Sequence, residues 1–308
     1  MPLDPLAKRL LTMMAAATPS ERQRPTTSER RASLAKLMQF ARAGTTSVSA
    51  TDGVLPGPGG DIAYRLYAPE GDPPAPGFIF FHGGGLVAGS IETHDRVAAA
   101  LAEATGCRLI SVDYRLAPEH KFPAATEDAI AATEFVARNA ASLGIDAEKL
   151  VVGGDSAGGT LAAVVCQHAL RHGPAIVAQC LICPVLDFEE ISPSREAFAE
   201  NHLIDRATLE ADLADYLPDG TDPADVRISP LRALHVAGLP ATIIHTAEFD
   251  PMRDEGNAYA RKLLAAGVSV EHVCHDGMIH NFHAMSAVLP QARLILSQIG
   301  EQVRRAVG

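Results

Sequence analysis

The chain has 308 residues, of which 47% are hydrophobic and 20% are charged, a balance that is ordinary for a globular protein and excludes disorder along its whole length. Its 26 Lys and Arg residues against 37 Asp and Glu residues give a net charge of −11, which disfavours binding to nucleic acid or to an anionic membrane surface. No apolar run reaches the roughly 18–20 residues that a membrane span needs.

The first segments of the chain are predicted to be helical, and strands follow them. Apolar residues three and four positions apart, among them Leu3, Leu6 and Leu10, predict a helix over residues 1–18. A second helical pattern runs to about residue 43, where Gly44 is expected to end it. Strands are predicted next at residues 46–50, 62–67 and 77–81.

From there helices and strands alternate along the chain. Helices are predicted at residues 96–105, 123–143, 157–172, 254–266 and 281–305, the last of them interrupted at Pro290. Strands are predicted at residues 108–112, 150–153, 179–183, 241–246 and 268–274. This alternation indicates an α/β fold with a mostly parallel central sheet of about eight strands, flanked by helices on both faces.

One segment interrupts the alternation. Residues 189–231 are acidic, lie between two predicted strands and include a predicted helix at 206–216. We expect this insertion and the N-terminal helices to form a helical cap over the carboxyl ends of the strands, where open α/β folds bind ligands. The predicted organisation places cap helices in residues 1–45, the core in residues 46–188 and 231–308, and a cap insertion in residues 189–230.

The sharpest local motif surrounds Ser156. It reads Gly154-Asp155-Ser156-Ala157-Gly158 and lies between a predicted strand and a predicted helix, the context of a nucleophile elbow. The glycines allow a sharp turn that projects the Ser156 hydroxyl from the edge of the sheet. The alternative is a glycine-rich turn that carries a serine by chance.

A second motif, His82-Gly83-Gly84-Gly85, follows another predicted strand. Its glycines allow backbone amides to approach a substrate, and two of them with the amide of Ala157 can surround a developing oxyanion. The alternative is a phosphate-binding loop, which is disfavoured because neither a G-x-G-x-x-G pattern nor a Lys-Ser/Thr pair follows.

A serine nucleophile needs a base, and in this fold the order along the chain is Ser, then Asp or Glu, then His, each after a strand. Asp250 and His280 satisfy that order and are the predicted acid and base. The competing candidates near them are Glu248, Asp254, His245, His272, His275 and His283.

These motifs together resemble the bacterial hormone-sensitive-lipase-like esterases (family IV) of the α/β-hydrolases. The resemblance covers nearly the whole chain and includes Asp113-Tyr114-Arg115-Leu116-Ala117-Pro118-Glu119-His120, Ser229-Pro230-Leu231, Asp250-Pro251-Met252-Arg253-Asp254-Glu255-Gly256 and His280-Asn281-Phe282. It implies an α/β-hydrolase fold with a helical cap, a Ser156–His280–Asp250 triad, and an oxyanion hole formed by Gly83, Gly84 and Ala157. Met252 and Cys183 depart from the residues that are common at their positions in the family.

The resemblance implies a carboxylesterase that hydrolyses short- to medium-chain acyl esters through an acyl-enzyme, with no cofactor and no metal. Amides, lactones and carbamates stay open as substrates, since the same residues act on those leaving groups. A receptor without catalysis, such as the related plant gibberellin receptors, is the alternative from another class; those proteins lack the histidine that is present here. Residues expected in the substrate pocket are Leu37, Phe40, Leu86, Asp155, Leu186, Met252 and Phe282.

Partners and location are predicted from composition and from the last strand. Five scattered cysteines argue against a secreted disulfide framework, so a cytoplasmic protein is expected. Cys180 and Cys183 have C-x-x-C spacing but lie in an apolar strand with no second pair, which argues against zinc. The last strand is expected at an edge of the sheet, where homodimers form in proteins resembling this one.

Overall fold

A computed structural model describes residues 1–17, 25–41 and 46–308, so the predicted stop at Gly44 lies outside the described residues. Its centre is a sheet of eight strands in the order β1-β2-β4-β3-β5-β6-β7-β8. The strands are β1 Ser49–Gly57, β2 Gly60–Ala68, β3 Ala75–Phe81, β4 Arg108–Val112, β5 Ile145–Asp155, β6 Ala178–Ile182, β7 Ala241–Phe249 and β8 Val270–Ile279. Strands β1 and β2 are antiparallel to their neighbours, and the other six are parallel. The predicted mostly parallel sheet is therefore confirmed.

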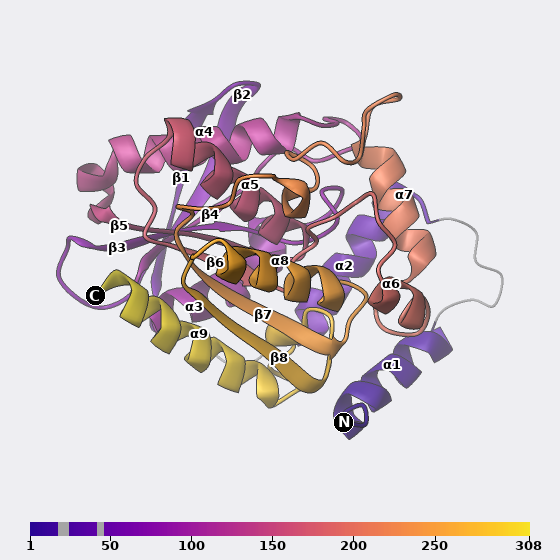
Figure 1. Ribbon diagram of the computed structural model, residues 1–308. Coiled ribbons are helices and arrows are strands. Elements are labelled where there is room, and N and C mark those ends of the chain that lie inside the picture. Colours follow the sequence, from indigo (N-terminus) through magenta and orange to yellow (C-terminus); the bar gives the residue numbers. More distant parts are fainter. Residues whose placement is uncertain (18–24, 42–45) are drawn as a thin grey trace.

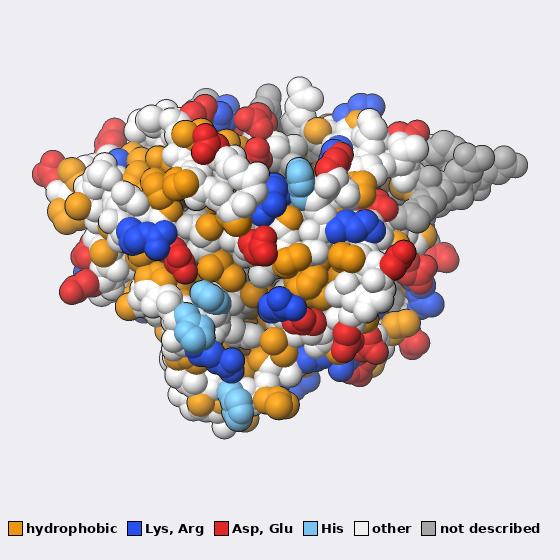
Figure 2. All heavy atoms as spheres, turned by 90° about the horizontal axis from the view of Figure 1, so that it is seen from above, with side chains coloured by type: hydrophobic (Ala, Val, Ile, Leu, Met, Phe, Trp, Pro, Cys, Tyr) orange, Lys and Arg blue, Asp and Glu red, His pale blue; other side chains and the backbone are white. Residues whose placement is uncertain are grey.

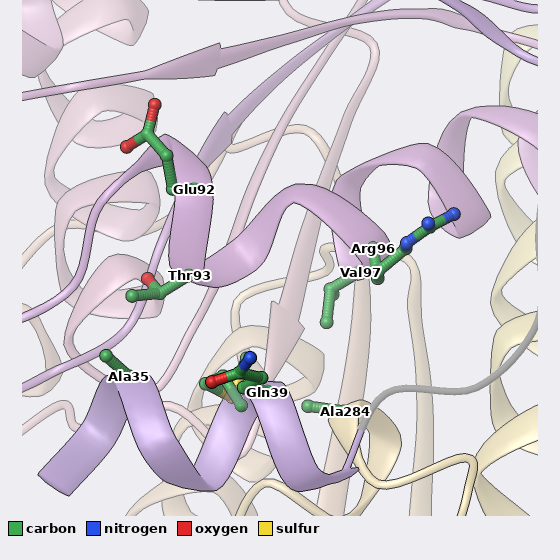
Figure 3. A pocket seen from close by; sticks show the side chains of 8 residues that line it. Ala35, Gln39, Glu92, Thr93, Arg96, Val97 and Ala284 are labelled. Carbon is green, nitrogen blue, oxygen red and sulfur yellow. The ribbon is translucent and has the colours of Figure 1, made fainter.

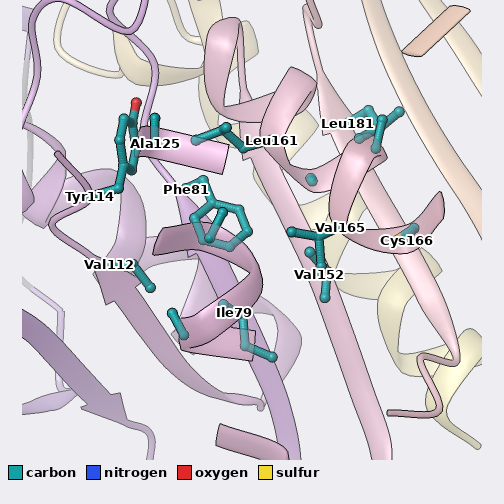
Figure 4. Packing of buried hydrophobic residues seen from close by; sticks show 14 of the residues in the cluster. Ile79, Phe81, Val112, Tyr114, Ala125, Val152, Leu161, Val165, Cys166 and Leu181 are labelled. Carbon is teal, nitrogen blue, oxygen red and sulfur yellow. The ribbon is translucent and has the colours of Figure 1, made fainter. Parts of the chain in front are cut away.

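Helices cover both faces of this sheet (Figure 1). The long helices are α3 Ile91–Thr105, α4 Ala124–Arg138, α5 Ala157–His172, α8 Arg253–Ala265 and α9 Gln291–Val307. Helices α3 and α9 share one hydrophobic cluster, and α4, α5 and α8 share another. Strand β3, which is buried from Gly77 onward, contributes to both clusters, because Phe78 and Phe80 point to one face while Ile79 and Phe81 point to the other. Figure 4 shows Ile79 and Phe81 in the cluster that α4 and α5 share. Two cores are thus separated by one sheet.

The remaining helices gather at one side of the molecule. They are α1 Pro5–Ala17, α2 Thr27–Ala41, α6 Pro193–Ala197 and α7 Arg206–Tyr216 (Figure 1). Helices α2 and α7 are joined by Arg30, whose Nη2 lies 2.8 Å from Asp212 Oδ2. Helix α2 and the 189–230 insertion are therefore in direct contact, although Arg30 and Asp212 lie 182 positions apart in the sequence.

Several predicted segments have the wrong boundaries, among them the first strand and the last helix. The first strand was expected at residues 46–50, but β1 starts at Ser49 and continues to Gly57. Pro56 and the neighbouring glycine are compatible with this strand because it lies at an edge of the sheet. The helical pattern at residues 281–305 contains only a short 3₁₀ turn, Phe282–Ala284, before α9 begins at Gln291.

The surface agrees with the composition. Figure 2 shows one face of the molecule, on which acidic, basic and hydrophobic side chains are interspersed. In the described parts of the chain, no helix has both the length and the apolar character needed to cross a membrane.

Candidate active site

The turn between β5 and α5 holds Ser156 in an unusual backbone conformation. Its φ of 52° and ψ of −121° lie in a region that side-chain-bearing residues rarely adopt, at a cost on the order of 1–3 kcal/mol. Space for the turn depends on glycine, since a Cβ on Gly158 would collide with the carbonyl oxygen of Phe81. The Ser156 amide donates to the Ile182 carbonyl at 2.9 Å, which ties the turn to the end of β6. The hydroxyl is thereby fixed at the carboxyl edge of the sheet.

Asp250 and His280 are brought together by the pairing of the last two strands. Phe249 at the end of β7 is the register partner of Ile279 at the end of β8, so the residues that follow them are neighbours. The Nδ1 atom of His280 lies 2.8 Å from Asp250 Oδ2. The other carboxylate oxygen, Asp250 Oδ1, accepts the Met252 amide at 2.8 Å. This bond fixes the carboxylate against the start of α8.

The third contact completes a chain of three side chains. His280 Nε2 lies 3.0 Å from Ser156 Oγ. Asp250 and His280 are fully buried, and Ser156 is 4% exposed. Because the Asp250 carboxylate accepts a hydrogen bond from Nδ1–H, the proton of the neutral imidazole stays on Nδ1. The Nε2 lone pair then faces the serine hydroxyl and can take its proton.

The competing candidates have other partners. Glu248 accepts the Gly277 amide at 2.7 Å and pairs with the N-terminal ammonium group, while Asp254 bonds the Ser194 amide at 2.9 Å. His245 lies 2.8 Å from His275 on β8 and 2.7 Å from Gln302 on α9. His272 contacts Thr246 at 3.1 Å. None of these contacts involves Ser156.

The glycine loop after β3 differs from the prediction at one residue. The amide of Gly83 donates to Asp155 Oδ1 at 2.9 Å, so this amide does not fit the predicted role in an oxyanion hole. None of the described backbone hydrogen bonds uses the Gly84 amide as donor. Ala157 is the first residue of α5, and amides at a helix start have no intrahelical acceptor. The amides of Gly84 and Ala157 are therefore free of these backbone contacts, and their predicted role as oxyanion-hole donors stays a prediction.

His82, which opens this loop, is held from two sides. Its ring stacks between Tyr114 and His94, with centroid distances of 4.4 and 5.3 Å. The Tyr114 hydroxyl donates to the His82 carbonyl at 2.6 Å, and His82 Nδ1 lies 2.9 Å from the Gly83 carbonyl. Burial lowers the pKa of His82 to about 3, so the imidazole is neutral and can donate from Nδ1. The segment after β4, through Tyr114, thus packs against the loop.

The residues predicted for the substrate pocket are mostly buried. Leu86, Leu186, Met252 and Phe282 are each no more than 1% exposed, and Leu37 is partly buried. Phe40 is 57% exposed, which places it at the surface and not in a buried wall. Asp155 is 1% exposed and is turned toward Gly83, so its carboxylate contacts the protein itself.

A small cavity lies elsewhere, between α2 and α3 (Figure 3). Its volume is about 200 Å³. It is lined by Ala35, Met38, Gln39, Glu92, Thr93, Arg96, Val97 and Ala284. No residue of the Ser156–His280–Asp250 group contributes to it, and none of the predicted pocket residues does.

The Cys183 side chain lies beside the proposed catalytic residues, a position that the sequence did not predict. The thiol of Cys183, the Asp250 carboxylate and the His280 imidazole offer three potential metal-ligand atoms within 4.8 Å of one another. Burial and the Asp250 carboxylate raise the pKa of the Cys183 thiol, so it is protonated. His280 and Asp250 are already joined by their hydrogen bond, which a metal would have to replace. This set therefore fits a serine hydrolase better than a metal site.

Sequence patterns gave no signal for several contacts around the glycine loop. A Cβ on Gly85 would collide with Asp212 of α7, so the 189–230 insertion reaches the loop itself. The Gly83–Asp155 bond joins residues 72 positions apart. Such contacts depend on how the elements pack, which composition and spacing do not encode.

Comparison with known proteins places this arrangement in a family. Residues 78–284 match the model of a family described as having the alpha/beta hydrolase fold. The chain belongs to the esterases of the α/β-hydrolase family. It is 41% identical over 242 residues to the carboxylic ester hydrolase LipN of Mycobacterium tuberculosis, a match that covers 76% of this chain and 64% of that protein.

Further relatives of this α/β-hydrolase carry related names. The ethyl acetate hydrolase of Pseudomonas putida is 37% identical over 239 residues, covering 76% of this chain and 75% of that protein. The solved structure of a hyperthermophilic esterase from Pyrobaculum calidifontis is 36% identical, covers 100% of both chains and superposes with a TM-score of 0.94. The predicted fold and the predicted family are both confirmed.

Proposed function

We propose that this α/β-hydrolase is a carboxylesterase that hydrolyses short- to medium-chain acyl esters with Ser156 as nucleophile, His280 as general base and Asp250 as its partner. The observation that carries the proposal is the pair of contacts from His280, at 3.0 Å to Ser156 Oγ and at 2.8 Å to Asp250 Oδ2. The preference for short acyl chains is supported by the similarity to a protein named ethyl acetate hydrolase.

The reaction follows from these atoms. Ser156 Oγ attacks the ester carbonyl while its proton passes to His280 Nε2, and Asp250 stabilises the imidazolium that forms. The imidazolium then protonates the leaving alcohol, and the acyl group stays on Ser156. Water attacks the acyl-enzyme by the same route, which releases the carboxylic acid and restores the serine.

The tetrahedral intermediate carries an oxyanion that needs donors. The amides of Gly84 and Ala157 supply them in this proposal, and the Gly83 amide is left with Asp155. Each such donor is worth roughly 100–1000-fold in rate, because it is fixed before the charge develops.

Hydrolysis of p-nitrophenyl butyrate by the wild type and by Ser156→Ala tests the proposal. We expect the substitution to lower kcat by about 10⁴–10⁶-fold, since the nucleophile is removed. The matched control is Ser111→Ala, because Ser111 is also fully buried and its hydroxyl has no partner among the described residues. Equal activity in Ser156→Ala and the wild type would refute the role of Ser156. A wild type that neither hydrolyses the ester nor reacts with a fluorophosphonate at Ser156 would refute the esterase.

We also propose the division into cap and core given by the sequence. The N-terminal helices and residues 189–230 would form one cap over the carboxyl ends of the strands. The contact of Asp212 with Gly85 supports this arrangement, because it brings the insertion next to the loop that carries a proposed oxyanion donor.

A homodimer through the last strand completes the proposal. Strand β8 lies at an edge of the sheet, where its outer backbone groups can pair with a second copy. Light scattering at micromolar concentration should give twice the 32.4 kDa mass of the chain. We expect Val273→Lys, which puts a charge on this partly exposed edge, to shift the mass toward the monomer. A wild type of 32.4 kDa under these conditions would exclude the dimer.

A further inference from the structure

The carboxylate of Asp155 is a buried acidic group to which the proposed reaction assigns no step. Asp155 directly precedes Ser156, is 1% exposed and ends β5. Burial by itself raises the pKa of Asp155, but the neighbouring imidazoles of His94, His283 and His82 together more than offset this and lower it to about 2. The side chain is therefore an anion held inside the protein, and such a charge is costly unless it is well bonded.

One oxygen of this carboxylate fixes the glycine loop. Asp155 Oδ1 accepts the Gly83 amide at 2.9 Å, a charge-assisted hydrogen bond between two fully buried groups. The loop lies tight against the nucleophile here, because a Cβ on Gly83 would come within 2.5 Å of Asp155 Oδ2 and 3.1 Å of Ser156 Cβ. The bond thus links the peptide before Gly84 to the residue next to the nucleophile.

The other oxygen faces two histidines from different elements. Asp155 Oδ2 lies 3.6 Å from His94 Nε2 on α3 and 4.0 Å from His283 Nε2 after β8. His94 is fixed in turn by Thr93, whose Oγ1 lies 2.8 Å from His94 Nδ1. Thr93 also belongs to the capping box that begins α3, together with Ser90. The carboxylate therefore lies against the start of α3, an element separate from the loop that it holds.

We propose that Asp155 is a positioning residue for the oxyanion hole: by accepting the Gly83 amide it fixes the glycine loop so that the Gly84 amide faces the oxyanion on the Ser156 side. This inference rests on the proposed esterase function and adds to it a residue that touches no substrate. Three consecutive glycines have more conformational freedom than any other tripeptide, so the loop needs an anchor. Oxyanion donors act through being fixed in advance, and a loosened loop loses that advantage.

The proposal separates two properties of Asp155, its charge and its acceptor oxygen. Asp155→Asn keeps an oxygen at the position that accepts the Gly83 amide, and its new amide group faces imidazole nitrogens of His283 that have no partner among the described residues. Asp155→Ala removes the acceptor. If the acceptor oxygen positions the loop, asparagine rescues most of the activity that alanine loses.

The test is the hydrolysis of p-nitrophenyl butyrate by the wild type, Asp155→Asn, Asp155→Ala and a control, Asp146→Ala, at the other end of the same strand. We expect Asp155→Ala to lower kcat about 100-fold with KM changed less than threefold, and Asp155→Asn to stay within about tenfold of the wild type. A trifluoromethyl ketone, whose adduct with Ser156 carries an oxyanion, should bind more weakly in proportion to the loss of kcat. Asp146→Ala should match the wild type.

The outcomes distinguish a failure of the role proposed for Asp155 from a failure of the proposed esterase function. An active wild type with an equally active, folded Asp155→Ala would overturn this inference and leave the esterase intact. A wild type without activity counts against the proposed function instead. If Asp155→Ala does not fold, a folded Asp155→Asn that has lost more than 100-fold in kcat overturns the inference, because the charge and not the acceptor would then matter. A loss that falls on KM alone also contradicts it.

Discussion

Single residues at the β5–α5 turn show how closely backbone packing and the reactive group are linked. Ser156 is one of six described residues other than glycine with positive φ, and Leu86 and Cys183 close to the site are two others. The turn is possible because Gly158 lets α5 approach the end of β3, where the Phe81 carbonyl leaves no room for a Cβ. The position of the Ser156 hydroxyl thus depends on the absence of a Cβ at Gly158.

Gly158→Ala should therefore displace α5 and the serine together. A shift of about 1 Å at a reacting group can cost about 100-fold in rate, so we expect kcat/KM for p-nitrophenyl butyrate to fall by at least that factor. The control is Gly106→Ala, at a glycine with φ of 72° that has open space around it. That variant should lose about 1 kcal/mol of stability from backbone strain and keep its activity. Equal activity in both variants would show that the turn tolerates the methyl group.

The three proposed catalytic residues could be found from the sequence because each lies in the loop that follows a predicted strand. Parallel strands end at one edge, so Ser156, Asp250 and His280 had to meet there. The bond between Gly83 and Asp155 could not be found in this way, because it depends on how the β3 loop is turned. The exposure of Phe40 likewise depends on the rotation of α2, and the pattern of α2 defines no clear apolar face.

At the scale of elements, β7, β8 and α9 are joined by a buried polar chain. His245 on β7 lies 2.8 Å from His275 on β8 and 2.7 Å from Gln302 on α9. Burial, followed by the charge of His275, lowers the pKa of His245 to about 3. Burial likewise lowers the pKa of His275 to about 4, against the opposing effect of Asp276. Both imidazoles are neutral in the folded protein at pH 5, whereas the unfolded chain protonates them below about pH 6.5.

Stability should therefore fall as the pH drops from 7 to 5. The unfolded state binds more protons in this range, so the free energy of unfolding decreases, by about 2 kcal/mol at pH 5 for His245 alone. His245→Gln removes this titrating group and should flatten the pH dependence by about that amount, measured by urea unfolding at pH 7, 6 and 5. Identical slopes for the variant and the wild type would contradict this, because they would mean that His245 binds its proton equally well in the folded and the unfolded state.

Boundaries of elements were harder to predict than their existence. Residues 157–172 and 206–216 form the helices that the sequence predicts, because capping residues mark their ends: Gly173 follows α5, and the Asp205 side chain caps the start of α7. Strand β5 begins at Ile145, five residues before the predicted start. Its first half is polar and pairs with β3 through only Ala75 and Pro76. A strand that is polar along half its length has no apolar alternation to reveal it.

At the scale of the whole molecule, the N-terminal helices tie the proposed cap to the core. Arg31 on α2 donates to the Val87 carbonyl at 2.8 Å and to the Ala117 carbonyl at 3.1 Å, both in core loops. Arg30, next to it, bonds Asp212 of the insertion with two nitrogens, at 3.2 and 2.8 Å. Adjacent arginines thus connect one helix to the core and to the insertion, and Asp212 in turn touches the glycine loop.

A double-mutant cycle on Arg30 and Asp212 should measure how firmly this connection holds. The two side chains are only 18% and 9% exposed, so water screens their attraction weakly. We expect a coupling free energy of about 1–2 kcal/mol from thermal or urea unfolding of Arg30→Gln, Asp212→Asn and the double variant. The control pair, Glu134 and Arg138, lies four residues apart on α4 with Arg138 68% exposed, and its coupling should stay near 0.3–0.5 kcal/mol.

The same variants report on the site, because Asp212 lies against Gly85. Loosening this contact lets the insertion move over the glycine loop, so each single substitution should raise the KM for p-nitrophenyl butyrate several-fold, and the double substitution should raise it little further. Additive effects on both stability and KM would contradict a connected cap. Coupling in stability with an unchanged KM would mean that the insertion stabilises the fold without shaping the entrance to Ser156.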